Sequence, residues 1–335
     1  MSDALSMLLD GVRAQGALFD RSFVRAPWSL RFEDHAPLTL VTMLGPDIAG
    51  GGTGAWVRPD GHDPVRVEPG DVAVLVGPEP FTISDEPDAP PRVVIHDDDV
   101  CTSPGGARVD DVPHLCSHRP LDDGDNIGND DAAALLKGSY RVQGSVGDRM
   151  LRGLPRVLTV PAATDGSRPA AGVDLIVAEL AHPRLGQQAV LDRLLDLLLV
   201  SMLREWLDRP ESSAPAWYQA LSDPVVGPAL RLVHHDPAHP WTVATLADRV
   251  AVSRATFARR FTDLVGEPPI GYLACWRLCL AADLLHRTDV TVGAVARQVG
   301  YANPEAFSVA FTRVYGVRPS EYRRDASATP ARAPA

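Results

Sequence analysis

The chain has 335 residues, of which 45% are hydrophobic and 22% charged, and its formal net charge is −11. This length predicts two domains, and the composition is typical of an ordinary globular protein. No stretch approaches the roughly 20 uncharged apolar residues of a membrane span. The start of the chain carries an acid and lacks the basic region of a signal peptide, and four cysteines are too few for a disulfide framework. We therefore expect a reducing cytoplasm as the compartment.

The first half of the chain predicts one helix followed by many short strands. Recurring leucines favour a helix over residues 3–20. Apolar and alternating runs separated by Gly and Pro then predict strands, at 25–32, 38–44, 55–57, 65–76, 81–84, 93–95, 135–140 and 157–160. Short strands at this spacing favour a β-sandwich or barrel.

A turn between two of these strands, Pro69-Gly-Asp-Val72, resembles the second motif of the cupin barrel. The resemblance implies a cupin-like sensor domain. Metal-binding cupins use a His pair and an acid as ligands, but Thr39-Leu-Val-Thr42 stands where the His pair belongs and Phe81 where the last ligand belongs. We therefore expect no metal or other cofactor, and no cupin dioxygenase or isomerase activity.

The segment 96–131 is rich in Asp, Gly and Pro and contains four side chains that bind metals or change redox state: Cys101, His114, Cys116 and His118. Three interpretations stay open. The segment is a solvated loop, the two cysteines form a regulatory disulfide, or the four side chains bind Zn²⁺.

Leucines spaced by three and four residues predict one long helix from about 173 to 207. Its apolar stripe either packs on the barrel or forms a homodimer seam through residues 187–207. The Pro- and Ser-containing stretch that follows predicts a linker over 209–222. The sensor domain and its connecting helix thus span 1–208.

A stretch near the C-terminus occurs twice. Four positions repeat at an offset of 49 residues and five more at an offset of 50, with Thr242, Ala247, Phe257 and Phe261 matching Thr291, Ala296, Phe307 and Phe311. Each copy predicts two short helices with a bend between them, at Ala251-Val252 and at Gly300-Tyr301. A cap residue opens each second helix, Ser253 in the first copy and Asn303 in the second. This is the helix-turn-helix pattern.

The two copies are joined by residues 269–286, which predict one continuous spacer helix. These features resemble the AraC/XylS family of transcription regulators. The resemblance rests on Gly266-Glu-Pro-Pro269, Trp276-Arg-Leu278, Val299-Gly-Tyr301 and Tyr315-Gly-x-x-Pro319-x-x-Tyr322-Arg323. The segment 25–28 also resembles the cupin-type sensor of one subfamily. The family implies an α+β chain: a cupin-like β-barrel with helices, then an all-α domain over 223–325 with two helix-turn-helix units joined by a spacer helix. Residues 326–335 are expected to be a disordered tail.

The charge is distributed unevenly. From Val226 onward the chain has 13 Arg and 9 acidic residues, a net charge of +4, whereas the part before it has a net charge of −15. A mildly basic C-terminal part suits a nucleic-acid module beside an acidic sensor.

Groove-facing positions of the second helix of each copy are those off the apolar stripe. They are Arg254, Ala255, Thr256, Ala258, Arg259 and Arg260 in the first copy, and Asn303, Glu305, Ser308 and Arg313 in the second. Arg259 corresponds to a family position that contacts bases, and Arg bonds guanine bidentately. Asn303 has an alternative role as a helix cap. Val309 stands where relatives carry a polar residue, which favours contact with thymine methyl groups or readout of DNA shape.

The sequence therefore predicts a sequence-specific DNA-binding transcription regulator that responds to a small molecule or an oxidant. The expected partners are double-stranded DNA, RNA polymerase, an effector and a second copy of the chain, with no membrane. The alternatives are a cupin-type metalloenzyme fused to a nucleic-acid-binding module, and an architectural DNA binder without a ligand.

Overall fold

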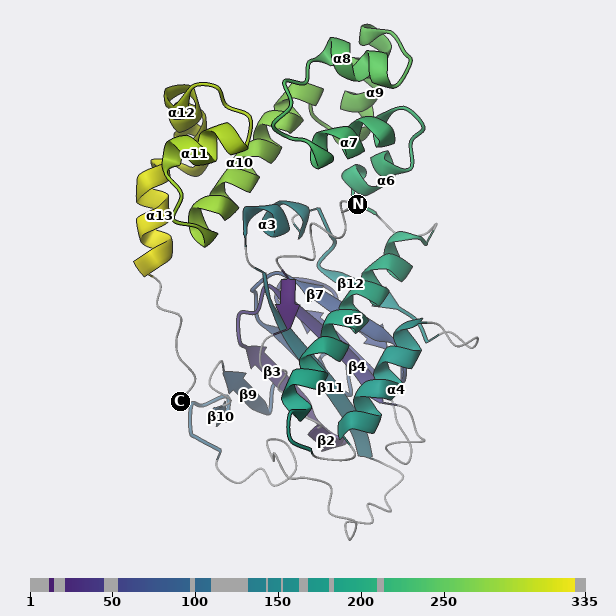
Figure 1. Ribbon diagram of the computed structural model, residues 1–335. Coiled ribbons are helices and arrows are strands. Elements are labelled where there is room, and N and C mark those ends of the chain that lie inside the picture. The colour runs from purple at the N-terminus through teal and green to yellow at the C-terminus, as the bar shows by residue number, and fades with distance from the viewer. Residues whose placement is uncertain are drawn as a thin grey trace. The chain divides into compact units, whose positions relative to one another are not determined.

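The computed structural model describes residues 12–14, 22–44, 54–96, 100–109, 132–142, 144–151, 153–162, 168–180, 184–209 and 214–328. They form two compact units (Figure 1). The β-unit comprises Val12–Val142 and Leu154–Ser213. The helical unit is formed chiefly by Ala214–Ala335, together with the internal segment Gln143–Gly153. A short piece from the middle of the chain thus belongs to the C-terminal unit.

The β-unit contains two sheets. In the first, the strand order is β1-β11-β4-β7-β12, with β2 also paired to β11; in the second it is β10-β9-β3-β8-β5-β6. All pairs are antiparallel except β3 with β9. The strands are β1 (Val12–Ala14), β2 (Ser22–Arg25), β3 (Ser29–Glu33), β4 (Leu38–Leu44), β5 (Ala55–Pro59), β6 (Val65–Val67), β7 (Val72–Val76), β8 (Phe81–Ser84), β9 (Val93–His96), β10 (Cys101–Thr102), β11 (Ala132–Val142) and β12 (Val157–Val160). The predicted β-rich fold of the N-terminal part is confirmed.

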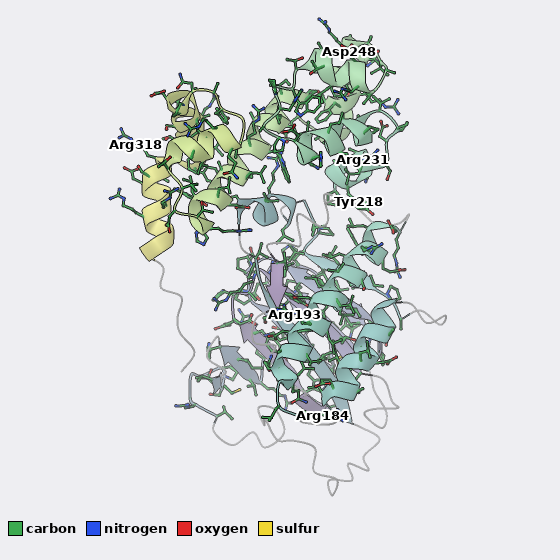
Figure 2. The ribbon with its side chains drawn as sticks, in the orientation of Figure 1. Arg184, Arg193, Tyr218, Arg231, Asp248 and Arg318 are labelled. Carbon is green, nitrogen blue, oxygen red and sulfur yellow. The ribbon has the colours of Figure 1, made fainter. Side chains whose placement is uncertain are left out.

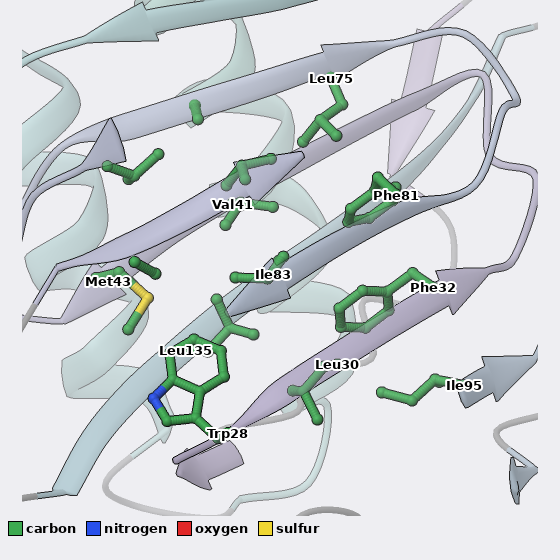
Figure 3. Close-up of a cluster of buried hydrophobic side chains, with 14 of the residues drawn as sticks. Trp28, Leu30, Phe32, Val41, Met43, Leu75, Phe81, Ile83, Ile95 and Leu135 are labelled. Atoms are coloured by element: carbon green, nitrogen blue, oxygen red, sulfur yellow. The ribbon is translucent and has the colours of Figure 1, made fainter. Parts of the chain in front are cut away.

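The core of the β-unit lies between the two sheets (Figure 3). Alternate residues of a strand point to the same face, so Leu30 and Phe32 of β3 meet Ile83 and Phe81 of β8 in register. The rings of Phe32 and Phe81 stack with centroids 5.0 Å apart. Side chains from β4, β7 and β11 complete the cluster from the opposite sheet. This cluster between the two sheets is therefore built from apolar side chains.

The sole lysine of the chain, Lys137, is buried in β11. Its ammonium forms an ion pair with Asp34 and lies 4.8 Å from the centroid of the Phe32 ring. The hydroxyl of Ser139 also donates to Asp34 at 3.0 Å. Burial acts to raise the pKa of Asp34, but Lys137 and Ser139 outweigh it and hold that pKa below its usual value. The charge is thus paired, as a buried charge must be.

Two helices, α4 (Arg168–Leu180) and α5 (Gln187–Leu207), lie side by side over the first sheet (Figure 1). The prediction of one long helix over 173–207 is wrong, because α5 begins anew after Gly186, whose φ of 84° is left-handed. α5 covers β11 closely. A Cβ at Gly138 would lie 2.9 Å from the Leu195 side chain, and the Tyr140 hydroxyl donates to the Leu195 carbonyl. This cover explains why every residue of β4 is buried.

Three further expectations are corrected. Val12–Ala14 form a strand paired with β11, not part of a helix over 3–20, because their backbone groups complete the edge of the first sheet. Ala216–Leu221 form a helix inside the expected linker, because Ala220 is buried in the core of the helical unit. The last helix continues to Ala328, into the expected tail. Residues 329–335 lie outside the described part.

The helical unit contains two hydrophobic cores that share one helix. Its helices are α3 (Ser145–Leu151), α6 (Ala216–Leu221), α7 (Val226–His235), α8 (Val243–Arg249), α9 (Arg254–Val265), α10 (Pro269–Arg287), α11 (Val292–Gln298), α12 (Pro304–Tyr315) and α13 (Pro319–Ala328). α10 contributes Trp276 to the first core and Leu285 to the second. The predicted spacer helix joining two helix-turn-helix units is confirmed. Among the described residues, no helix combines the length and the apolar character needed to cross a membrane.

Candidate nucleic-acid interface

The first helix-turn-helix unit is formed by α8 and α9. The hydroxyl of Thr242 accepts from the N–H of Thr245 at 3.1 Å, and the Thr245 hydroxyl accepts from the Thr242 N–H at 2.9 Å, so a capping box begins α8. Ala251 in the bend has a left-handed φ of 55°. Ser253 then caps α9 by accepting from the N–H of Thr256 at 3.2 Å. The bend and the cap lie where the sequence predicts them.

α9 buries Phe257 and Phe261 and turns its other face outward. Of its six predicted DNA-contacting residues, Ala258 is half-buried and the others are exposed, namely Arg254, Ala255, Thr256, Arg259 and Arg260. Neither Arg254 nor Arg259 forms an ion pair with any residue that the structure describes. Both guanidinium groups thus remain available for an anionic or hydrogen-bond-accepting partner.

Arg260 differs from its neighbours because it is held by a carboxylate. Its Nε lies 2.9 Å and its Nη2 2.6 Å from Asp223 Oδ2. The same carboxylate accepts from the N–H groups of Val225 and Val226, before and at the start of α7. Desolvation acts to raise the pKa of Asp223, but the hydrogen bonds from Arg260 and these N–H groups lower it. Arg260 therefore joins α9 to α7.

The second helix-turn-helix unit is formed by α11 and α12. Thr291 caps α11, and Gly300 takes a left-handed φ of 89° in the bend. Asn303 caps α12, with its Oδ1 accepting from the N–H of Glu305 at 2.7 Å and of Ala306 at 3.3 Å. This geometry shows that the Asn303 side chain acts as a helix cap.

The outward face of α12 carries little positive charge. Glu305, Val309 and Arg313 are exposed, and Val309 has 70% of its surface accessible. Ser308 is half-buried, and its hydroxyl donates to the carbonyl of Pro304 at 2.9 Å. Val309 lies in the middle of this face, and its side chain has no group that could form a hydrogen bond there.

The sequence analysis considered only the groove-facing positions of α9 and α12. It therefore missed exposed arginines beside these two helices. Arg249 lies in the last turn of α8 and Arg297 in the last turn of α11. Arg318 projects from the turn before α13 (Figure 2). Extending the search to the basic residues that flank each bend would have found Arg249 and Arg297, and extending it to the turn after α12 would have found Arg318.

The two helix-turn-helix units also contact each other directly. Arg277 of α10 donates to the carbonyls of Pro237 at 2.7 Å and His239 at 2.8 Å, in the loop before α8. Gly300 is packed against the same loop, since a Cβ there would lie 2.7 Å from the Ala238 Cα. The bend of the second unit is therefore fixed to the entrance of the first.

The cysteine and histidine candidates of segment 96–131 are only partly described. Cys101 is buried in β10, with 6% of its surface accessible, and it is disulfide-bonded. The interpretation as a solvated loop is thus wrong at Cys101, because β10 pairs with β9. His114, Cys116 and His118 lie outside the described residues, whereas Cys275 and Cys279 on α10 are not disulfide-bonded.

Metal-binding side chains do not gather in the described part of the chain, where no cluster of three or more His, Cys, Asp or Glu residues is placed to hold an ion. Thr39 and Phe81, at the positions that correspond to cupin ligands, are buried in their strands.

Comparison with known proteins supports the same division of the chain. A family described as Cupin matches residues 3–208, and a family described as Helix-turn-helix domain matches residues 246–325. A protein of Streptomyces antibioticus described as an AraC-like transcription regulator is 35% identical over 270 residues, which cover 80% of this chain and 83% of that protein. The HTH-type transcriptional regulator AlkR of Acinetobacter baylyi is 33% identical over 53% of this chain and 59% of its own length.

Among solved structures, the DNA-binding domain of AdpA in complex with a target DNA is 33% identical. It matches 33% of this chain over its whole length, with a TM-score of 0.32.

The fold and the outward faces of α9 and α12 define a DNA-binding transcription regulator. The chain belongs to the AraC-like transcription regulators that carry an N-terminal cupin domain.

Proposed function

We propose that the chain reads an operator by inserting α9 and α12 into two successive major grooves of duplex DNA. The observation that carries this proposal is the pair of exposed recognition faces joined by α10, which has 19 residues. At 1.5 Å per residue α10 is about 28 Å long. One DNA turn is roughly 34 Å. The spacer therefore has the length needed to serve adjacent grooves.

The two helices read their half-sites by different chemistry. α9 presents Arg254 and Arg259, which form no ion pair within the described part of the chain, and Arg259 is the candidate for bidentate contact with guanine. α12 presents the exposed Val309, which suits contact with a thymine methyl group. Thr256, Ala255, Glu305 and Arg313 border these contacts, while Asn303 supports α12 as its cap. Arg249, Arg297 and Arg318 are placed to contact phosphates.

The β-unit is the sensor in this proposal, and the protein acts in the cytoplasm with no catalytic activity of its own. A small molecule or an oxidant shifts the population of the DNA-competent arrangement, and the DNA-bound form contacts RNA polymerase. The predicted apolar stripe of α5 is buried in the structure, but Val190 and Leu197 on the same helix are exposed and suit a homodimer seam through residues 187–207. Each of these partners can be tested with the purified protein or in cells that carry the tagged protein.

Substitution of Arg259 tests the DNA-reading proposal. Genome-wide footprinting of the tagged protein first identifies an operator. Arg259→Ala is then expected to weaken binding to that operator by about 1–3 kcal/mol, because a bidentate base contact is lost. Gel-shift titration measures this loss, and Arg184→Ala, which removes an exposed arginine of the β-unit, is the matched control. Unchanged binding by Arg259→Ala would remove this residue from the interface.

A further inference from the structure

Helix α3 is an insertion between two strands of the β-unit, yet it packs in the helical unit. β11 ends at Val142, α3 spans Ser145–Leu151, and β12 begins at Val157. The segment Gln143–Gly153 nevertheless belongs to the compact helical unit, where α3 contacts α10. Both strands belong to the first sheet, where β11 is an inner strand and β12 is an edge strand. Short stretches of chain therefore join α3 to both strands.

The C-terminal end of α3 contacts the first helix-turn-helix unit. Arg149 forms an ion pair with Glu267, in the turn between α9 and α10, and its Nη1 donates to the Sγ of Cys275. Its guanidinium also lies 5.3 Å from the centroid of the Tyr272 ring. Partial burial acts to lower the pKa of Arg149, but Cys275 and Glu267 outweigh it, and the net pKa is raised. The Arg149 charge is thus stabilised by this set of contacts.

The N-terminal end of α3 contacts the second helix-turn-helix unit. The N–H of Ser145 donates to Asp283 of α10 at 2.6 Å. Gly144 takes a left-handed φ of 100°, and a Cβ there would lie 2.6 Å from the Asp283 carboxylate. Ser145 also acts to lower the pKa of the Tyr315 hydroxyl, at the end of α12. The approach of α3 to α10 therefore requires glycine at position 144.

Between these two ends, α3 completes the first hydrophobic core. Val146 has 5% of its surface accessible and is a member of the cluster that contains Phe257 and Phe261 of α9. Apolar burial of this kind stabilises the packed core. A helix that comes from the sensor part of the sequence is thus a structural component of the DNA reader.

We infer that α3 is the coupling element of the protein: it spans α10 from the first helix-turn-helix unit to the second and is tied by short connections to β11 and β12. The inference deepens the proposed function and rests on it. The contacts of α3 lie on Glu267, Tyr272, Cys275, Asp283 and Tyr315, and none of these belongs to the exposed faces of α9 and α12. Docked α3 therefore supports the DNA-competent arrangement, and a signal that moves the strands lowers operator affinity by undocking α3.

Hydrogen exchange on the full chain tests the inference with Gly144→Ala and Arg149→Ala. Both variants remove a contact that docks α3, so we expect faster amide exchange in α10 and also at the ends of β11 and β12 that flank α3. The matched control Arg184→Ala is expected to leave both regions unchanged. Faster exchange confined to α10, or no change in either region, would show that α3 is only a structural part of the reader.

Operator binding provides the second measurement. Undocking reduces the competent population, so both variants are expected to bind the operator roughly fivefold more weakly or worse. If Gly144→Ala does not fold, Asp283→Asn replaces it in this test, because asparagine keeps the size of the side chain. Affinity equal to wild type in folded variants would overturn the inference. If wild-type protein binds no operator, the proposed function fails, while the exchange experiment still decides whether α3 couples strands to α10.

Discussion

Three neighbouring arginines on one helix have different roles because their carboxylate neighbours differ. Arg254 and Arg259 have no ion-pair partner among the described residues, whereas Arg260 holds Asp223 with two guanidinium nitrogens. A bidentate arginine–carboxylate pair is geometrically specific. We therefore assign Arg260 to the attachment of α9 to α7 and leave the base contacts to its neighbours.

Substitution of Arg260 is expected to affect folding more than base recognition. Arg260→Ala should lower the unfolding temperature of the protein and leave the preference for operator over scrambled DNA unchanged. The pKa of Asp223 is lowered in the fold, so the stabilisation is present at neutral pH and is lost as the pH falls through that pKa. Thermal unfolding at several pH values measures this effect. A variant with wild-type stability but relaxed specificity would instead make Arg260 a base contact.

Cys101 supports an expectation about redox response. This residue is disulfide-bonded, whereas the other described cysteines, Cys275 and Cys279, form no disulfide. If the disulfide is a switch, reducing it and then restoring it with a mild oxidant changes operator affinity in wild type and has no effect in Cys101→Ser. Gel-shift titration with and without oxidant measures the difference, with Cys116→Ser as a second variant. An equal response in all three proteins would mean that the disulfide is not the sensor.

At the scale of elements, caps and buried phenylalanines determine where the recognition helices begin and how they face. Both α9 and α12 bury two phenylalanines four residues apart and end at a left-handed glycine, Gly266 in α9 and Gly316 in α12. The sequence repeat therefore produces the same local geometry twice. Burial of the two phenylalanines determines which face of α9 and of α12 remains exposed.

The cap of α12 can be separated experimentally from DNA contact. Asn303→Ala removes the acceptor of two backbone N–H groups and should cost about 1 kcal/mol of stability. Asn303→Ser retains a capping oxygen and is expected to match wild type in both unfolding temperature and operator affinity. If Asn303→Ser is stable but binds the operator poorly, the asparagine contacts a base in addition to capping the helix.

The helical unit was more predictable from the sequence than the β-unit, for physical reasons. Caps such as Ser253 and Asn303 act within a few residues, so their roles are visible in the local sequence. The break before α5 depends on Gly186, a left-handed position that a long leucine pattern conceals. The docking of Arg149 on Glu267 joins residues 118 apart, and no local pattern reveals such a contact.

At the scale of the molecule, the two packed units are not continuous segments of the sequence. Gln143–Gly153 is flanked by barrel strands but packs with the reader helices. A domain boundary drawn from composition places this segment in the sensor, because composition does not report tertiary contacts. If the chain is divided near residue 210, the helical unit therefore loses a part of its own core.

The stability of the helical unit is expected to depend on pH through a buried histidine. His234 on α7 is hydrogen-bonded to the Tyr272 hydroxyl at 2.6 Å and lies 4.4 Å from the Trp276 ring, centroid to centroid. Burial, aided by repulsion from Arg149, lowers the pKa of His234 to about 4. In the unfolded chain the pKa returns to about 6.5. Between these values the unfolded state binds the additional proton.

The sign of the effect follows from this difference. Stability is fully present above about pH 6.5 and falls as the pH is lowered toward 4, by up to about 3 kcal/mol. Urea unfolding between pH 4 and pH 7 measures the slope. His234→Gln should remove this part of the slope, whereas His235→Gln, which changes an exposed neighbour, should retain it. Because Arg149 is supplied by α3, Arg149→Ala should raise the His234 pKa and shift the transition to higher pH. An unchanged profile in His234→Gln would mean that acid destabilisation arises from the carboxylates instead.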